Sequence, residues 1–279
     1  MFEDVSEAFV ALRAGNDPYG LWMLEWVYGQ KPDINDLNKR LALGVSLFDN
    51  HAVIDTVWDI QPIEDKNWLE ESYKQFPAFE IGPFFIHGSH FEGTIPDDQM
   101  ALQIDAATAF GTGEHGTTKG CLEEMLALKE KGVCPWNILD MGTGSGILAI
   151  AAWKLWQTPI LAVDNEEESV RVSRKHQQEN GVADVPSALS CVCGDGYHTP
   201  EVSRRAPYDL IIANILAAPL IDMAPQCRAV SDDNGYVILS GMLIEQVPKV
   251  QAAYEAQGYT IVTQRNIDAW STLVLQLRC

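Results

Sequence analysis

The order strand, glycine-rich turn, helix, strand and acid between residues 137 and 164 constrains the fold more than any other feature of this chain. The first strand ends in Asp140-Met141, an apolar helical run begins at Ile147, and the second strand ends in Asp164. Three glycines make up the turn: Gly142, Gly144 and Gly146. Glycines at such a turn let the backbone approach a ligand closely, and the strand-end acid can accept hydrogen bonds from both ribose hydroxyls of a nucleoside. The pattern predicts a parallel α/β sheet and an adenosine-containing cofactor.

The spacing of these glycines distinguishes between adenosine cofactors. A dinucleotide fingerprint requires a glycine at the sixth position, which is Ile147 in this chain. Asp140 would repel a pyrophosphate but suits a cationic ligand. The form Asp-x-Gly-x-Gly-x-Gly with a later strand-end acid resembles motif I of the class I S-adenosylmethionine-dependent methyltransferases, whose cofactor carries a sulfonium and an ammonium and no phosphate. A nicotinamide or flavin enzyme fits less well, and a turn without a ligand leaves the placed acid unexplained.

The size and composition of the chain fit one large domain and a small one, because 279 residues with 47% hydrophobic side chains can form an ample core. The longest apolar runs fall far short of the ~20 residues that span a bilayer, and the first residues lack the basic start of a signal peptide. We therefore expect a soluble, cytoplasmic protein without a membrane partner.

Metal and disulfide chemistry find little support in the sequence. The six cysteines contain no Cys-x-x-Cys pair, and His87 and His90 have no third zinc ligand at a recognisable spacing. We expect buried, reduced cysteines and no metal site.

The formal net charge of −20 bears on the choice of partner. Nucleic-acid binding draws most of its affinity from Lys and Arg residues that neutralise phosphates, so we expect no extended contact with RNA or DNA. An acidic chain suits a basic protein partner, although the charge serves solubility equally well.

The chain from residue 135 onward alternates short apolar runs with helical segments, as in a doubly wound sheet. We expect helices at 147–155, 167–180, 216–230 and 244–257. The expected strands are 137–141, 159–164, 188–193, 208–213, 235–240, 260–263 and 273–277. The last two leave no room for a helix between them and suit an antiparallel hairpin. The predicted fold class is α/β, with a seven-stranded Rossmann-like class I methyltransferase sheet and a small α+β N-terminal domain.

The N-terminal segment has a different pattern. Residues 21–28 and 52–60 have strand-forming composition, and a helical pattern lies between them at 34–43. We expect three parts: a small α+β domain at 1–60, a linker at 61–80 with a short helix at 68–76, and the large domain at 81–279.

A second glycine-rich loop runs from Phe110 to Lys119, directly before an amphipathic stretch at 121–131. A phosphate-binding P-loop would need Lys where Thr117 stands, and the acid that a dinucleotide site places about twenty residues later is absent. What remains is a loop that ends in the hydroxyls of Thr117 and Thr118 at a helix N-terminus. Such hydroxyls can cap the helix or bind a carboxylate.

Three segments together carry a more specific resemblance. They are the run from Ala109 to Thr118, motif I from Ile138 to Ala152, and Asn214-Ile215-Leu216-Ala217. In this order they resemble the PrmA family, the methyltransferases of the large-subunit ribosomal protein L-eleven, over roughly residues 80 to 279. The resemblance implies that S-adenosylmethionine is used to methylate the α-amine and lysine ε-amines of that protein, and that a small N-terminal domain recognises it.

The resemblance also implies roles for individual residues. The loop ending at Thr118 would fold over the cofactor, Thr118 would contact its methionine end, and Asp164 would hold the ribose. Asp195 would meet the adenine amino group, although an Asp-Gly turn is an equally simple reason for it. The residues implied to bind the cofactor are Phe110, Gly111, Thr117, Thr118, Asp140, Gly142, Gly144, Asp164, Asn165, Asp195 and Asn214.

Asn214 is the candidate catalytic residue, because it ends the fourth strand at the edge where doubly wound sheets bind ligands. Methyltransferases of adenine N6 or glutamine have Pro-Pro-aromatic after this position, whereas this chain has Ile215-Leu216-Ala217. The missing ring argues against a planar acceptor and fits an aliphatic amine. A strand-end Asn that satisfies its own backbone is the simpler alternative.

Two other functions remain open from the sequence. One is a class I methyltransferase that acts on another protein, a small amine or RNA. The other is a non-catalytic module that binds S-adenosylmethionine, although the Asn214 segment is then unexplained.

Overall fold

The computed structural model describes residues 8–13, 22–27, 31–46, 59–60, 77–105 and 116–278. Contacts divide the chain into two compact units, Met1–Lys66 and Asn67–Cys279. In the first unit, β1 (Ala8–Arg13) pairs with β2 (Trp22–Val27) in antiparallel register, and α1 (Ile34–Ser46) follows. Asp33 begins α1, since its Oδ1 accepts the amide of Asn35. The sequence predicted β2 and α1 but not β1. The expected strand at 52–60 and helix at 68–76 lie outside the described residues, apart from 59–60.

The second unit is built on one sheet of seven strands in the order β11-β12-β10-β9-β6-β7-β8. Five neighbouring strands, from β10 to β8, are parallel, and β12 and β11 form the antiparallel hairpin. The strands are β6 (Ile138–Met141), β7 (Ile160–Asp164), β8 (Leu189–Cys193), β9 (Tyr208–Asn214), β10 (Ser231–Leu243), β11 (Tyr259–Ile267) and β12 (Trp270–Leu277). The predicted α/β class and the seven predicted strands are confirmed.

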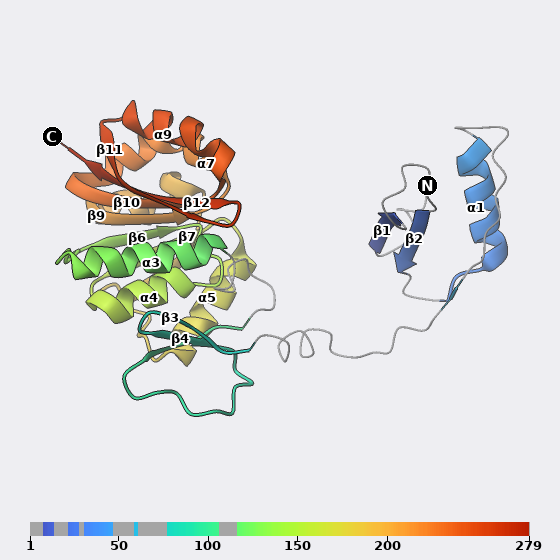
Figure 1. Cartoon of the computed structure of the whole chain (residues 1–279), viewed down its shortest axis with the longest axis horizontal. Helices are drawn as coiled ribbons and strands as arrows, with labels where there is room; N and C mark the ends of the chain where they lie inside the picture. Colours follow the sequence, from blue (N-terminus) through green and yellow to red (C-terminus); the bar gives the residue numbers. More distant parts are fainter. Residues whose placement is uncertain are drawn as a thin grey trace. The chain divides into compact units, whose positions relative to one another are not determined.

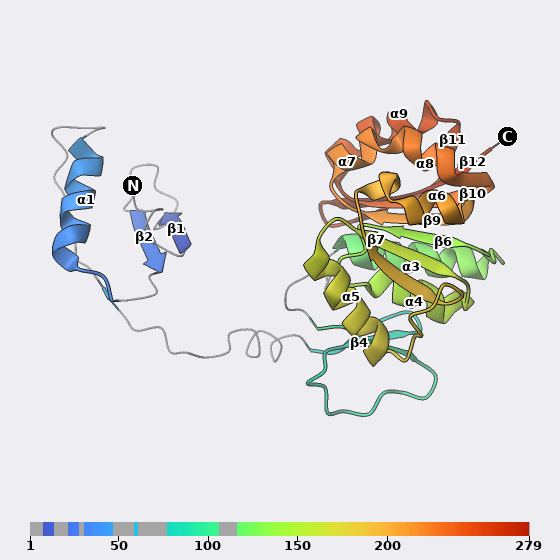
Figure 2. The same ribbon diagram turned by 180° about the vertical axis from the view of Figure 1, so that it is seen from behind.

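Helices cover both faces of this sheet (Figure 1). On one face lie α3 (Gly116–Glu130), α4 (Ile147–Trp156) and α5 (Glu167–Glu179). On the other lie α6 (Pro200–Arg205), α7 (Ala217–Asp222), α8 (Ala224–Val230) and α9 (Val247–Glu255), which Figure 2 shows from behind. Two short 3₁₀ turns, η1 (Gly196–His198) and η2 (Ile244–Gln246), precede α6 and α9.

Alternating side chains of the strands build two cores. Ile138 and Ile212 pack with α3 to α5, whereas Leu139 and Ile211 pack with the helices of the opposite face. Successive residues of a strand point to opposite faces, and a parallel sheet covered on both sides therefore reads as a continuous apolar run.

The predicted helix at 216–230 is wrong as a single element. The structure has α7 and α8 instead, separated at Met223. Pro225 lies in the first turn of α8, where it needs no backbone N–H. Within a continuous helix its ring would clash with the carbonyl of residue 221, so the chain breaks and restarts.

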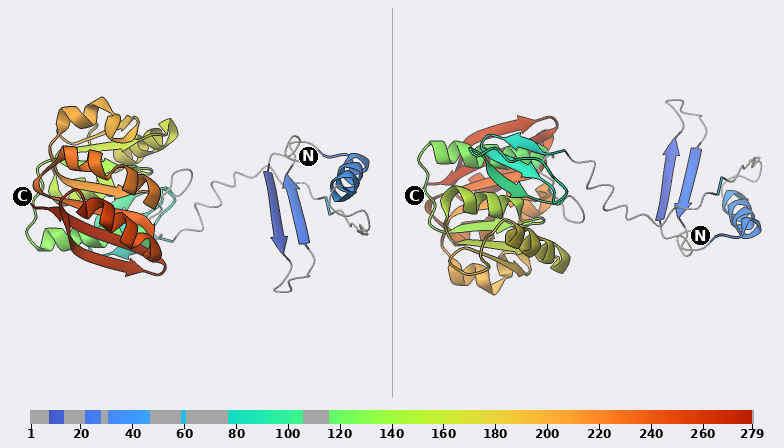
Figure 3. Two further views of the ribbon diagram at one scale, coloured as in Figure 1. Left: turned by 90° about the horizontal axis from the view of Figure 1, so that it is seen from above. Right: turned by 90° about the horizontal axis from the view of Figure 1, so that it is seen from below.

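A small sheet that the sequence did not predict lies outside α3 and α4 (Figure 3). It contains β3 (Phe79–Ile81), β4 (Phe84–His87) and β5 (Met100–Gln103) in that order. Phe84, Ile86 and Leu102 join the core beneath α4. The strand β5 carries the chain to Asp105 beside α5, where Asp105 contacts His176.

The cysteine prediction holds only in part. Cys121, Cys191 and Cys227 are buried free thiols, but Cys134 and Cys193 are exposed. Cys193 lies at the end of the edge strand β8, and Cys134 lies in the connection between α3 and β6. Cys279 lies outside the described residues. Among the helices of the described residues, none is long and apolar enough to cross a membrane.

Replacing Gly146, the residue before α4, tests how tightly that helix packs on α5. An alanine Cβ would lie 2.5 Å from Ser173 Oγ and 3.2 Å from Ser173 Cα, at a φ of 82°. Gly132 has the same φ of 82° with nothing within 4 Å, so Gly132→Ala isolates backbone strain of about 1–2 kcal/mol. We expect Gly146→Ala to lower the free energy of unfolding by about 1–3 kcal/mol more than the control does. Urea denaturation measures both, and equal losses would show that Gly146 does not pack tightly on α5.

Candidate cofactor and acceptor site

The order in which the chain adds strands reverses at β6, and several predicted site residues lie at this point. From β6 the chain builds β7 and β8 on one side, then returns to place β9 and β10 on the other. Ligands of doubly wound sheets bind at such a switch point, outside the carboxyl ends of the strands. The glycine turn follows β6, and Asn214 ends β9 beside it.

The glycine turn has a backbone path that only glycine follows easily. Gly142, Gly144 and Gly146 have φ values of 74°, 54° and 82°. A Cβ on Gly142 would lie 2.3 Å from Ile215 Cγ2, and one on Gly241 of β10 would lie 2.2 Å from the Ile215 carbonyl oxygen. Ile215, the residue after Asn214, is thus held between two glycines. Sequence reasoning missed Gly241, although a glycine inside an apolar strand signals a close approach.

Asp164 supports the turn and retains acceptor capacity. Its Oδ2 accepts the Gly144 amide at 2.8 Å, and its Oδ1 accepts the Glu166 amide at 3.1 Å. The side chain is nearly buried at the end of β7. Each carboxylate oxygen has two lone pairs, so one position on each stays open for a ribose hydroxyl.

Asp140 is a buried acid with an unpaired oxygen. Its Oδ2 accepts a hydrogen bond from Thr143 Oγ1 at 2.6 Å, whereas Oδ1 has no hydrogen-bond partner. Burial raises the pKa of Asp140 to about 7, and the charge of Asp164 raises it too, while the Thr143 hydrogen bond opposes the shift. A buried carboxylate is costly unless a positive group pairs with it. This unsatisfied oxygen therefore fits a cationic cofactor.

Thr118 and Asn214 are in direct contact although 96 positions separate them. Asn214 Nδ2 donates to Thr118 Oγ1 at 3.3 Å. Thr118 is fully buried in the first turn of α3, and Asn214 is half-buried at the end of β9. Among the described residues, Asn214 Oδ1 has no hydrogen-bond partner, so it is available to a donor from another molecule.

A buried serine that the sequence analysis did not single out supports this contact. Ser240 lies opposite Asn214 in the β9–β10 register and is fully buried. Its Oγ donates to the Thr117 carbonyl at 3.3 Å and lies 2.8 Å from Thr272 Oγ1. Its position at the end of an apolar strand, on the same sheet edge as Asn214, was the available signal.

The other predicted site residues are Thr117, Asn165, Asp195, Phe110 and Gly111. Thr117 is buried beside Thr118, and its carbonyl accepts from Ser240. Asn165 and Asp195 are exposed on the loops after β7 and β8, at the same sheet edge. Phe110 and Gly111 lie outside the described residues.

One cluster among the described residues has the atom types of a metal site: Asp105, His176 and Glu179. Both nitrogens of the His176 ring are already engaged, by the Ser145 carbonyl and the Asp105 amide. The Lys175 ammonium contacts both carboxylates. The arrangement therefore suits a hydrogen-bonded junction rather than a cation.

Comparison with known proteins decides the family. A family model described as "Ribosomal protein L11 methyltransferase (PrmA)" matches residues 23–278. The chain belongs to the PrmA family. The match extends further toward the N-terminus than the resemblance read from the sequence. Members of this family are methyltransferases, so the predicted fold, enzyme class and S-adenosylmethionine cofactor are confirmed.

Individual PrmA relatives agree with this assignment. A ribosomal protein L11 methyltransferase from Rhizobium meliloti (strain 1021) is 41% identical over 77% of this chain and 72% of the relative. One from Rhodopseudomonas palustris (strain BisB5) is 35% identical over 98% of this chain and 90% of the relative. The crystal structure of a ribosomal protein L11 methylase from Lactobacillus delbrueckii subsp. bulgaricus has a TM-score of 0.64 and 29% identity. It corresponds to 73% of this chain and 100% of that one.

The pKa of Asp140 predicts how cofactor affinity depends on pH. A cationic cofactor stabilises the charged carboxylate, so the Kd of S-adenosylmethionine should rise as pH falls below about 7, approaching tenfold per pH unit. Asp140→Asn should bind more weakly at pH 8 and lose this pH dependence. Isothermal titration calorimetry between pH 6 and 8 measures both.

Asp209→Asn is the matched control for this experiment. Burial also raises the pKa of Asp209, but its carboxylate accepts the amides of Trp136 and Asn137 at the opposite end of the sheet. This variant should keep the pH dependence of the unmodified protein. A Kd that stays constant in the unmodified protein would refute the role of Asp140.

Proposed function

We propose that this chain transfers methyl groups from S-adenosylmethionine to the α-amine and lysine ε-amines of ribosomal protein L11. The names of its relatives support the substrate. The contact between Asn214 and Thr118 carries the proposal, because it joins the acceptor end of β9 to the start of α3 directly beside the glycine turn. Donor and acceptor groups would therefore meet at the switch point of the sheet.

The residues of the glycine turn and of the neighbouring strand ends would bind the cofactor. Asp164 would accept the ribose hydroxyls, and Gly142 and Gly144 would let the backbone pass close to the nucleoside. Asp140 would face the positive charge. Asn165 and Asp195 would contact the adenine from the two exposed loops, and Phe110 and Gly111 would complete the site.

The start of α3 would receive the methionine end of the cofactor. The first amides of a helix have no partners within it and favour a carboxylate. Thr117 and Thr118 lie in this first turn, and Ser240 and Thr272 hold it in place. Gly120 lets α3 lie close to Thr272 of β12, since a Cβ at Gly120 would lie 2.3 Å from Thr272 Oγ1.

The acceptor amine must be neutral before it attacks. At pH 7 a lysine of pKa ~10.4 loses its proton at a cost of about 4.6 kcal/mol, whereas an α-amine of pKa ~8 costs about 1.4 kcal/mol. The bound cofactor supplies an electrophilic methyl group on a positively charged sulfur, and that charge favours the neutral amine.

Asn214 would then orient the amine. Its Oδ1 can accept an amine N–H, while its Nδ2 is committed to Thr118 and fixes the rotation of the amide group. The amine lone pair would thus point at the methyl group. An amide takes up no proton near pH 7, so its contribution is orientation rather than proton transfer.

Residues 1–60 would recognise the substrate, and residues 81–279 would hold the catalytic site, with 61–80 between them. Residues 1–60 carry ten acidic and four basic side chains, a net charge of −6. A ribosomal protein that binds RNA is basic, so the charges would complement each other. A ribosomal substrate would also place the enzyme in the cytoplasm, and recognition of a protein requires no extended contact with RNA.

A labelling experiment tests the proposed substrate. The protein is incubated with tritiated S-adenosylmethionine, unmethylated ribosomal proteins and, separately, ribosomal RNA. We expect label on ribosomal protein L11, at its α-amine and lysines. Label on RNA or on another protein would replace the proposed substrate, and binding without any transfer would indicate a non-catalytic module.

Asn214→Ala should remove methyl transfer while leaving cofactor affinity nearly unchanged. Loss of a group that orients reacting atoms lowers kcat by roughly 10²–10³-fold. Asn137→Ala is the control: this Asn is buried at the other end of the sheet and donates to the carbonyls of Arg205 and Pro207. It should lose stability but keep its kcat. An active Asn214→Ala variant would rule out this role.

Removal of residues 1–60 should separate recognition from cofactor binding. We expect an unchanged Kd for S-adenosylmethionine and a raised KM for the ribosomal protein, because the missing acidic unit would supply contacts to the substrate only. Steady-state kinetics with the shortened and full chains measure this difference. Identical KM values would assign recognition to the large unit.

A further inference from the structure

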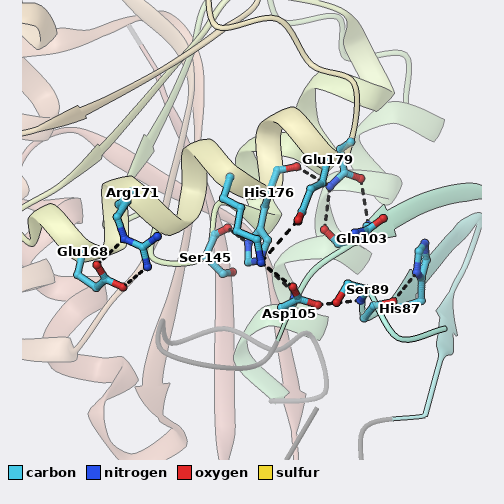
Figure 4. A network of polar contacts seen from close by, with 12 residues as sticks. His87, Ser89, Gln103, Asp105, Ser145, Glu168, Arg171, His176 and Glu179 are labelled. Carbon is cyan, nitrogen blue, oxygen red and sulfur yellow. Dashed lines mark hydrogen bonds and ion pairs between the residues drawn. The ribbon is translucent and has the colours of Figure 1, made fainter. Parts of the chain in front are cut away.

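A buried histidine on α5 joins the glycine turn to the end of β5. His176 is only 1% exposed. Its Nδ1 lies 2.8 Å from the carbonyl oxygen of Ser145, and its Nε2 lies 3.1 Å from the amide nitrogen of Asp105 (Figure 4). Ser145 stands between Gly144 and Gly146 in the turn. The ring therefore bridges two segments that are far apart in the sequence.

The two contacts determine the protonation of the ring. The Asp105 amide can only donate, so Nε2 must be the unprotonated acceptor. Nδ1 then carries the hydrogen and donates it to the Ser145 carbonyl. Burial lowers the pKa of His176, although the Ser145 carbonyl and the acids Asp105 and Glu179 oppose this shift. The ring is thus neutral near pH 7, as both hydrogen bonds require.

Asp105 is itself firmly held. Its Oδ2 accepts from Lys175 Nζ at 2.9 Å, and its Oδ1 accepts the Ser89 amide at 2.7 Å (Figure 4). Burial disfavours its charge, but the hydrogen bonds from Lys175 and Ser89 lower the pKa of Asp105 overall. The Asp105 backbone therefore offers His176 a fixed point of attachment.

The turn is held from its other side by Asp164. The Asp164 carboxylate accepts the amide of Gly144, while His176 donates to the carbonyl of the next residue, Ser145. One turn earlier on α5, Ser173 packs against Gly146. Three glycines with positive φ make this backbone costly to order, so side chains that fix it in advance reduce the entropy lost on binding.

We propose that His176 is a positioning residue for cofactor binding, which presets the glycine turn through its Nδ1–H bond to Ser145. The proposal rests on the proposed location of the cofactor at this turn. The ring nitrogens of His176 bond to backbone atoms of Ser145 and Asp105, and not to the side chain of Asn214 or Asp164, so the residue acts through the backbone. Its loss should weaken cofactor binding and leave kcat at saturating cofactor within about twofold.

Two substitutions test the two hydrogen bonds of the His176 ring separately. In His176→Asn the amide can still donate near the Nδ1 position, whereas in His176→Gln an oxygen can still accept near the Nε2 position. We expect His176→Asn to keep a Kd for S-adenosylmethionine within about threefold of the unmodified protein. His176→Gln and His176→Ala should raise the Kd about tenfold. Calorimetric titration measures the Kd, and methyl-transfer kinetics measure kcat and KM.

Gln177→Ala is the matched control. Gln177 is the next residue of α5, is equally buried, and donates to the Leu189 carbonyl at 2.8 Å on β8 rather than to the turn. It should lower the melting temperature as much as His176→Ala does and leave the Kd unchanged. Equal Kd values in all variants, or a Kd raised by Gln177→Ala as well, would overturn the proposal.

A measurement on the unmodified protein needs no variant to fold. Nitrogen-15 NMR of the histidine rings should show His176 as the Nδ1–H tautomer with slow exchange of that hydrogen, and an Nε2–H tautomer would contradict the bridge. The outcomes also separate this proposal from the proposed function. Normal binding by His176→Ala in an enzyme that methylates protein refutes only the positioning role, whereas an unmodified protein that binds no cofactor refutes the site itself.

Discussion

The backbone between β6 and α4 passes through three left-handed conformations in five residues, and the rest of the site depends on that path. Gly142 leaves room for Ile215, so the strand β9 can end directly beside the turn. Gly144 presents its amide to Asp164, and Gly146 lets α4 start against α5. A side chain at Gly142 would displace Ile215, the residue after Asn214, and one at Gly146 would displace Ser173 of α5.

The candidate site contains a buried acid whose charged form would be unfavourable without a ligand. Asp140 is buried with one oxygen unpaired, and burial raises its pKa to about 7. The Asp140 carboxyl group holds its proton more tightly in the folded protein than in the unfolded chain. The free energy of unfolding therefore falls as the pH rises from the ordinary pKa of an aspartate towards 7. A positively charged cofactor would offset that cost. The same acid would thus destabilise the empty protein and strengthen binding.

The sequence predicted the parts of the site that are local and missed those that depend on distant contacts. The glycine turn and Asp164 were predictable, because their spacing along the chain encodes the strand-turn-helix geometry. Thr118 and Asn214 were each singled out by a position at the end of an element, but their contact was not predicted, since 96 positions separate the two residues. Gly241 and His176 were missed because only the folded chain brings them to Ile215 and Ser145. The small sheet of β3, β4 and β5 was not predicted, because its strands have only three or four residues each.

We propose that the methyl donor and the methyl acceptor meet between the glycine turn and Asn214. A crystal structure of the protein with S-adenosylhomocysteine tests it most directly. We expect the ribose hydroxyls on Asp164, the methionine carboxylate at the first turn of α3, and the sulfur facing Asn214. A cofactor bound elsewhere, or a sulfur turned away from Asn214, would contradict it.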